Sequence, residues 1–328
     1  MLKRSKGIDM NSTPLVSIVI PVYNGANFVA EAIESALKQS YQNIEILVIN
    51  DGSCDDGATE QVVAQYADRV KYIKKENGGV ATALNLGIEE MRGQYFSWLS
   101  HDDLYQPNKI RAQIDFLSAL GFPDVVVYTN HYNLIESSKT SYLARHQPCT
   151  DLEFRAKKLV ANNQIHGCAL LIPRKAFEVA GLFDTKLRVA QDYDLWFRIA
   201  KTFPFRYLDD ASTTGRVHAS QVGVRLHERV LIENDEFRLH CLKQLSDAEI
   251  ASLGNGEKAL GLLYLALRMY RMGCPASHAY LSSELKKLVS LQPRRIGVAL
   301  LAALAVGVDF CHVTALKTVR RMRTRTVS

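Results

Sequence analysis

Short apolar runs alternate with helical stripes along the first hundred residues of the chain. Continuous β-branched runs are typical of strands buried in a parallel sheet, whereas apolar residues three and four positions apart are typical of helices. The predicted strands are residues 15–20, 45–50, 70–74 and 95–99, and the predicted helices between them are residues 28–39, 56–66 and 80–91. This alternation predicts βαβ units and therefore an α/β fold with a doubly wound, mostly parallel sheet.

The rhythm of the chain changes after a further predicted helix. The remaining elements expected before residue 226 are helices at 107–120, 151–160, 174–180 and 192–202, strands at 124–129 and 168–172, and edge strands at 206–208 and 213–217. From there to about residue 292 the pattern is helical, with breaks near residues 246, 254–256 and 273–275. The expected organisation is a flexible leader (1–13), an α/β domain (14–225), a helical C-terminal region (226–292) and an apolar, basic tail (293–328).

The tail has two interpretations. Residues 296–308, IGVALLAALAVGV, are apolar on every side, but a membrane-spanning helix needs about twenty such residues. Residues 286–328 carry nine Lys or Arg residues against one acid, whereas the whole 328-residue chain has a net charge of only +6. An apolar helix with flanking basic clusters suits a membrane surface, and a buried helix or dimer contact with a solvated tail suits the pattern equally.

The composition argues against a nucleic-acid partner and favours a reducing compartment. A nucleic-acid-binding protein would carry a basic stripe with interleaved aromatic residues on its folded part, and the sequence shows none. The six cysteines are scattered without a CxxC pair, which argues against a disulfide framework or a zinc site and fits a reducing compartment. The basic N-terminal residues lack a following apolar run, so we expect a cytoplasmic chain without a signal peptide.

Four polar turns follow predicted strands. They are Tyr23-Asn24, Asp51-Gly52-Ser53, Asn77-Gly78-Gly79 and Asp102-Asp103. The carboxyl ends of parallel strands lie on one edge of a sheet, where ligands bind, so these turns are expected to converge. None has the Walker or GxGxxG spacing, which disfavours P-loop hydrolases and nicotinamide enzymes and points to a nucleotide held through metal, ribose and base.

Asp102 and Asp103 have a functional and a structural interpretation. Adjacent carboxylates at the end of a buried strand are costly unless a cation or hydrogen-bond donors meet them, so we interpret them as a divalent-metal site. A solvated turn that caps the next helix is the alternative. Asp192 likewise is either functional or an acid favoured in the first turn of a helix. His218 taken alone is more often an ordinary histidine than a ligand.

Seven motifs in order strengthen the functional interpretation. They are IPVYN at 20–24, NDGSCDD at 50–56, ENGGVATALNLGI at 76–88, SHDD at 100–103, GLFD at 181–184, QDYDLWFRI at 191–199 and RVH at 216–218. Over roughly residues 14–220 the chain thus resembles the inverting nucleotide-sugar glycosyltransferases of family two, which have the GT-A fold.

The resemblance implies roles for matching residues. It implies that Pro21, Tyr23, Asn24 and Asn77 shape the nucleotide pocket, with Tyr23 stacking near the base, and that Asp51 accepts a hydrogen bond from the base, often uracil. It implies that Asp103 ligates Mn²⁺ or Mg²⁺, that Asp102 reaches the ribose or a metal-bound water, and that His218 is a further metal or diphosphate ligand. It places Asp192 at the position of the catalytic base.

Three positions depart from the family pattern. Asn50 and Gln191 stand where acids are common, and SHDD replaces spaced acids, so the metal ligand is either Asp102 or Asp103. Without a second negative charge at position 191, we expect Asp192 to titrate lower than it would beside another acid.

The sequence therefore predicts a metal-dependent inverting glycosyltransferase. We expect a nucleotide-sugar donor, UDP-linked by resemblance, and a lipid-linked or surface-polysaccharide acceptor at the inner face of the cell membrane, which the basic tail contacts. A nucleotidyltransferase is one alternative, although residues 22–27 lack the basic triphosphate loop that it needs. A catalytically inert subunit that binds nucleotide-sugar or lipid is the other.

Overall fold

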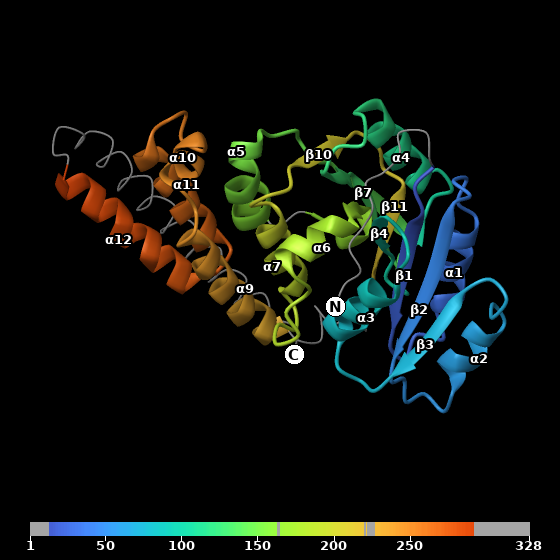
Figure 1. Ribbon diagram of the computed structural model, residues 1–328. Helices are drawn as coiled ribbons and strands as arrows, with labels where there is room; N and C mark the ends of the chain where they lie inside the picture. The colour runs from blue at the N-terminus through green and yellow to red at the C-terminus, as the bar shows by residue number, and fades with distance from the viewer. Residues whose placement is uncertain (1–12, 163–164, 220, 222–226, 292–328) are drawn as a thin grey trace, which may run out of the picture. The chain divides into compact units, whose positions relative to one another are not determined.

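The predicted strands and helices of the first hundred residues all form in the computed structural model of the protein (Figure 1). The structure describes residues 13–162, 165–219, 221 and 227–291. The predicted leader up to residue 12 and the predicted tail at 293–328 lie outside the described residues. The chain divides into two compact units, one of residues 1–151 with 164–227 and one of residues 152–163 with 228–328.

A seven-stranded sheet forms the centre of the first unit, in the order β10-β6-β9-β4-β1-β2-β3. Its strands are β1 (Val16–Val22), β2 (Ile44–Asp51), β3 (Lys71–Lys75), β4 (Tyr95–Trp98), β6 (Val126–Thr129), β9 (Leu170–Pro173) and β10 (Phe205–Leu208). All neighbours pair in parallel except β9, which runs antiparallel to both β4 and β6. The mostly parallel sheet is thus confirmed, and the reversed β9 places its first residues beside the end of β4.

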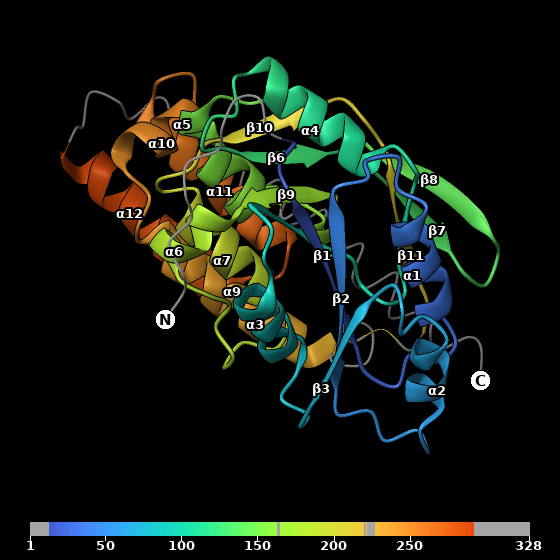
Figure 2. The same ribbon diagram turned by 45° about the vertical axis from the view of Figure 1, so that its right-hand side comes forward.

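Helices cover both faces of this sheet. They are α1 (Val29–Leu37), α2 (Ala58–Ala64), α3 (Val80–Glu90), α4 (Lys109–Ala119), α6 (Arg174–Ala180) and α7 (Gln191–Ile199). In both views α1 and α2 lie on one side of β1, β2 and β3, and α3 lies on the other side (Figures 1 and 2). The doubly wound arrangement follows from the alternation in the sequence, since each strand that is apolar on both faces needs cover on both.

A second, four-stranded sheet was mostly missed by the sequence analysis. Its order is β5-β11-β7-β8, with β5 (Leu104–Tyr105), β7 (His131–Ile135), β8 (Thr140–Ala144) and β11 (Thr213–Val217). The prediction that residues 213–217 form an edge strand is wrong, because β11 lies between β5 and β7. The other three strands are too short or too polar to give a pattern of their own. Since β11 pairs with β5, it brings residues near 216 to the turn after β4.

The second unit is helical, as predicted. A short α5 (Asp151–Glu153) leads into a π-helix, η1 (Phe154–Asn162). The π-helix contacts α9 (His227–Leu242), α10 (Asp247–Ser252) and α11 (Lys258–Arg271), and α12 (Pro275–Leu291) packs against α11. The Nε of Arg238 in α9 donates to the Val160 carbonyl at 3.2 Å. Asp235 accepts hydrogen bonds from the first backbone N–H groups of α12. Within the described ranges, no helix is both long and apolar enough to cross a bilayer.

Candidate active site

The turns after β1, β2 and β4 meet at one edge of the sheet. The backbone N–H of Asn24 donates to the Ser53 Oγ at 2.9 Å, and the backbone N–H of Cys54 donates to the Asn24 Oδ1 at 2.8 Å. Gly25 lies against the His101 ring, since an added Cβ would come within 2.4 Å of it. These contacts confirm that the polar turns converge.

Asp51 and Asn77 build the next turn along this edge. The Asp51 carboxylate accepts from the Lys75 Nζ at 2.6 Å and from the backbone N–H groups of Gly78 and Gly79 at 3.0 and 2.7 Å. The Asn77 side chain donates to the Asp51 carbonyl at 2.8 Å. Both side chains therefore hold the turn before α3, and Asp51 reaches this edge with its carboxylate already engaged by protein donors.

Tyr23 offers an open aromatic surface beside these turns. Tyr23 is 42% exposed, and its hydroxyl lies 3.3 Å from the Cys54 Sγ. Pro21, by contrast, is buried within β1, where it pairs with Ile49 of β2. A flat ring that faces solvent next to a polar turn provides a stacking surface for a base.

Asp102 and His218 come together from positions 116 residues apart. The His218 Nε2 lies 3.0 Å from the Asp102 Oδ2, and each side chain is 14% exposed. Burial opposes ionisation, but the neighbouring His101 charge and the hydrogen bond to His218 outweigh it and lower the pKa of the Asp102 carboxyl. The result is an ionised oxygen beside an imidazole nitrogen.

Asp103 lies in a different environment from its neighbour. Its carboxylate is 5% exposed, its Oδ1 accepts the Arg216 backbone N–H at 2.9 Å, and its Oδ2 lies 3.2 Å from the Cys168 Sγ. Burial, and then the Asp102 charge, raise the pKa of the Asp103 carboxyl to about 7. The two adjacent acids therefore differ in charge and partners, which the sequence did not reveal.

Asp192 is the second residue of α7. Its Oδ1 accepts the backbone N–H of Tyr193 at 2.8 Å, and burial raises the pKa of its carboxyl to about 6. The missing charge at position 191 does not decide the pKa of Asp192, because desolvation is the largest cause of its shift. In the described part of the chain, no hydrogen bond or ion pair joins Asp192 to another predicted site residue.

Two contacts nevertheless tie the segment around Asp192 to the same edge. The Arg188 Nη1 donates to the Gly78 carbonyl at 3.1 Å, and the Tyr193 hydroxyl donates to the Ile165 carbonyl at 2.9 Å. The start of α7 is thus held between the turn before α3 and the segment that leads into β9.

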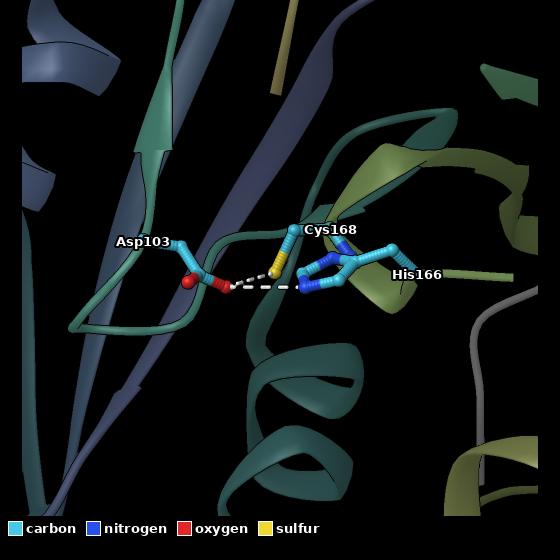
Figure 3. Close-up of side chains that lie close together, drawn as sticks. All are labelled: Asp103, His166 and Cys168. Carbon is cyan, nitrogen blue, oxygen red and sulfur yellow. Dashed lines mark hydrogen bonds and ion pairs between the residues drawn. The ribbon is translucent and has the colours of Figure 1, made fainter. Parts of the chain in front are cut away.

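His166 and Cys168 are site residues that the sequence analysis missed. They precede β9 and approach Asp103 from across the end of β4 (Figure 3). Their HxC spacing matches no metal motif, and Asp103 lies more than sixty residues earlier. An antiparallel assignment of β9 would have revealed them, because the start of such a strand lies where its neighbours end.

The fold is an α/β fold, and carboxylates, an imidazole and an exposed aromatic ring lie together at the ends of its strands. These features are typical of enzymes that bind a nucleotide and a cation. Residues 17–179 match the model of glycosyl transferase family 2. The chain belongs to this family and has its GT-A fold.

Relatives share this domain and differ in length. An uncharacterised glycosyltransferase of Rickettsia felis is 48% identical over 212 residues, which is 63% of this chain and 35% of that protein. The hyaluronan synthase of Pasteurella multocida is 28% identical over 219 residues, 66% of this chain and 22% of the synthase. The chain therefore spans about a third or less of the length of these two relatives.

Solved structures share the fold at low identity. Residues 1–349 of Staphylococcus aureus TarS in complex with UDP align with a TM-score of 0.50 and 14% identity, over 83% of this chain and 91% of that one. The mannosyltransferase PcManGT from Pyrobaculum calidifontis, in complex with GDP-Man and Mn²⁺, aligns with a TM-score of 0.51 and 18% identity, over 90% of this chain and 88% of that one.

Replacing Asp192 by Asn is expected to stabilise the folded chain above pH 6. The carboxyl has a pKa of about 6 in the folded chain and about 3.9 when unfolded. The unfolded state therefore loses its proton first as the pH rises, and the free energy of unfolding falls between these two values. The variant avoids this loss. Its free energy of unfolding should exceed that of the wild type by up to about 3 kcal/mol at pH 8 and should equal it below pH 4.

Urea unfolding of the wild type and Asp192→Asn at both pH values measures this difference. The exposed Asp68→Asn serves as the matched control and should show no such gain. An equal effect of Asp192→Asn at both pH values would contradict the titration argument.

Proposed function

We propose that the protein transfers a sugar from a nucleotide-sugar donor to an acceptor hydroxyl. The observation that supports this most is the meeting of the Asp102 and His218 pair with the turns that carry Tyr23 and Asp51. Family membership agrees with this reaction class.

The donor is proposed to lie across the strand ends with its base on the Tyr23 ring. Asn24 and Ser53 fix the turn beside this ring, and Asp51 and Asn77 fix the adjacent one. We propose a UDP-linked donor because the TarS structure contains UDP. The GDP-Man in the PcManGT structure is the competing case, so binding of UDP-, GDP- and dTDP-sugars to the chain decides the base.

A divalent cation is proposed to bind at Asp102 and His218. An ionised carboxylate oxygen and an imidazole nitrogen 3.0 Å apart are donors that suit Mn²⁺, and the oxygen also suits Mg²⁺. Asp103, the ligand implied by the resemblance, accepts the Arg216 N–H with its Oδ1 and turns its Oδ2 toward Cys168 and His166, whereas His218 pairs with Asp102. We therefore assign the cation to Asp102. When bound, it neutralises charge on the departing diphosphate.

Asp192 is proposed to be the general base. A half-buried carboxyl with a pKa of about 6 is mostly ionised at neutral pH yet basic enough to take a proton from a hydroxyl. Attack by that hydroxyl on the face opposite the diphosphate inverts the anomeric carbon. One carboxylate suffices because the leaving group needs no proton from a second acid.

The acceptor is proposed to be a lipid-linked saccharide or a surface polysaccharide. The similarity to hyaluronan synthase, a polysaccharide-forming protein by name, supports a saccharide acceptor. The apolar and basic pattern of residues 293–328 supports peripheral contact with the inner face of the cell membrane.

Asp192→Asn should abolish transfer while leaving donor binding intact. The amide keeps the shape of the side chain but cannot accept a proton, so kcat should fall by about 10²- to 10⁴-fold. In the wild type, kcat should rise with pH through about 6 as the Asp192 carboxyl ionises. Donor binding by calorimetry and transfer measured from released nucleoside diphosphate test this. Transfer at the wild-type rate would show that another group is the base.

Asp102→Ala and His218→Ala should each weaken Mn²⁺-dependent donor binding by at least about tenfold. Asp103→Asn preserves the acceptor for the Arg216 N–H, so this variant should weaken Mn²⁺-dependent donor binding less. Titration of donor with Mn²⁺ and with EDTA measures the difference. If Asp103→Asn weakened donor binding more than Asp102→Ala, Asp103 would be the cation ligand. A chain that binds donor but never transfers sugar would be the inert subunit.

Removal of residues 293–328 should move the protein from membranes to the soluble fraction. The segment carries seven Lys or Arg residues against one acid, a net charge as large as that of the whole chain, and each basic residue near an anionic surface contributes about 1 kcal/mol. Sedimentation with anionic vesicles compares the full chain with the truncated one, and neutral vesicles provide the control. Unchanged partitioning would favour the interpretation that the tail packs against protein.

A further inference from the structure

We propose that Asp103, His166 and Cys168 form a second cation site, selective for Zn²⁺ or a similar soft divalent ion and distinct from the site at Asp102 and His218. These three side chains offer an oxygen, a nitrogen and a sulfur that all lie within 4.8 Å of one another. Figure 3 shows them pointing toward a common point from the turn after β4 and from the segment before β9.

The spacing of the ligand atoms fits a tetrahedral ion. The Asp103 Oδ2 lies 3.2 Å from the Cys168 Sγ and 3.8 Å from the His166 Nε2. Zinc bonds of about 2.0–2.3 Å to oxygen, nitrogen and sulfur at tetrahedral angles separate the ligand atoms by about 3.3–3.6 Å. The two separations from Asp103 differ from this range by a few tenths of an ångström, and the His166 and Cys168 ligand atoms, which lie within 4.8 Å of each other, complete the set.

The surroundings of these side chains let an ion reach them and include a buried nitrogen without a hydrogen-bond partner among the described residues. The Asp103 and Cys168 side chains are buried, but the His166 side chain is 27% exposed, so an ion can enter past the imidazole. His131, which is 6% exposed, has a ring centroid 4.7 Å from that of His166. Its Nδ1 is buried and has no hydrogen-bond partner among the residues that the structure describes. It lies beside the imidazole of His166 but is not one of the three grouped ligands.

The sulfur distinguishes this site chemically from the first. Asp102 and His218 offer no thiol, and hard ions such as Mg²⁺ and Mn²⁺ prefer oxygen, whereas a thiolate selects zinc. Binding replaces the hydrogen bond that the Cys168 thiol donates to Asp103 with a zinc–sulfur bond. The thiol proton leaves to solvent, so each ion bound releases at least one proton.

Zinc at this site would fix the turn that carries both aspartates. Asp103 would then be held from two sides, by the Arg216 N–H on Oδ1 and by the ion on Oδ2. Asp102 is its immediate neighbour in the chain. The proposed ion is therefore structural, and it acts on the first cation site through the backbone of residues 102–103.

Cobalt titration of the full chain, stripped of metal with EDTA, tests the proposal. Bound Co²⁺ should give a thiolate-to-cobalt absorption band in the near ultraviolet, with one equivalent per chain, and Zn²⁺ should displace it. Cys168→Ser should remove the band, and His166→Gln should weaken cobalt binding at least tenfold. Cys54→Ser, which changes an exposed thiol, is the matched control and should leave the band unchanged.

The results separate this proposal from the proposed function. Absence of the band, or a band that persists in Cys168→Ser, overturns the second site. Thermal unfolding confirms that Cys168→Ser is folded, and His166→Gln supplies the decisive comparison if it is not. Mn²⁺-dependent donor binding is measured on the same wild-type sample, so its loss counts against the proposed function alone.

Discussion

The hydrogen bond from the Arg216 backbone N–H to the Asp103 carboxylate is the contact on which the site depends. It joins residues 113 apart in the chain, at 2.9 Å, and it ties the second sheet to the end of β4. Burying a carboxyl group costs several kcal/mol unless it is hydrogen-bonded, so this contact and the Cys168 thiol make the buried position tolerable. Strand pairing with β5 and β7 sets the register of β11, and this hydrogen bond fastens its end to the turn that carries Asp102, the partner of His218.

This arrangement gives the adjacent residues Asp102 and Asp103 different partners and different pKa values. Asp102 faces two imidazoles and ionises readily, whereas Asp103 is surrounded by backbone and thiol groups and holds its proton more tightly. Like charges on neighbouring residues would repel if both were ionised. The fold separates the roles by burying Asp103 among backbone and thiol groups and leaving Asp102 partly buried beside His218, so the carboxyl with the lowered pKa is the one that faces an imidazole.

The sequence predicted most of the first sheet and the converging turns, because strands such as Val16–Val22 are apolar on both faces and the helices between them have clear stripes. It missed β7 and β8, whose HYNLI and TSYLA segments mix polar and apolar residues in too few positions. It named Asp51, Asp102, Asp103, Asp192 and His218 as candidates, and their roles stay predictions. It did not pair Asp102 with His218 or find His166 and Cys168, since those contacts depend on strand directions that no local pattern encodes.

The π-helix Phe154–Asn162 has a consequence for how the chain is made and divided. It lies in the middle of the sequence but packs with helices synthesised after residue 227, and its Phe154, Leu159 and Val160 are fully buried there. During synthesis the π-helix therefore emerges long before α11, which begins at Lys258, is available to pack against it. A fragment that stops where the family motifs end would lack α10 and α11, which contact this π-helix in the whole chain. The π-helix therefore links the part of the chain that holds the motifs to helices that come long after it.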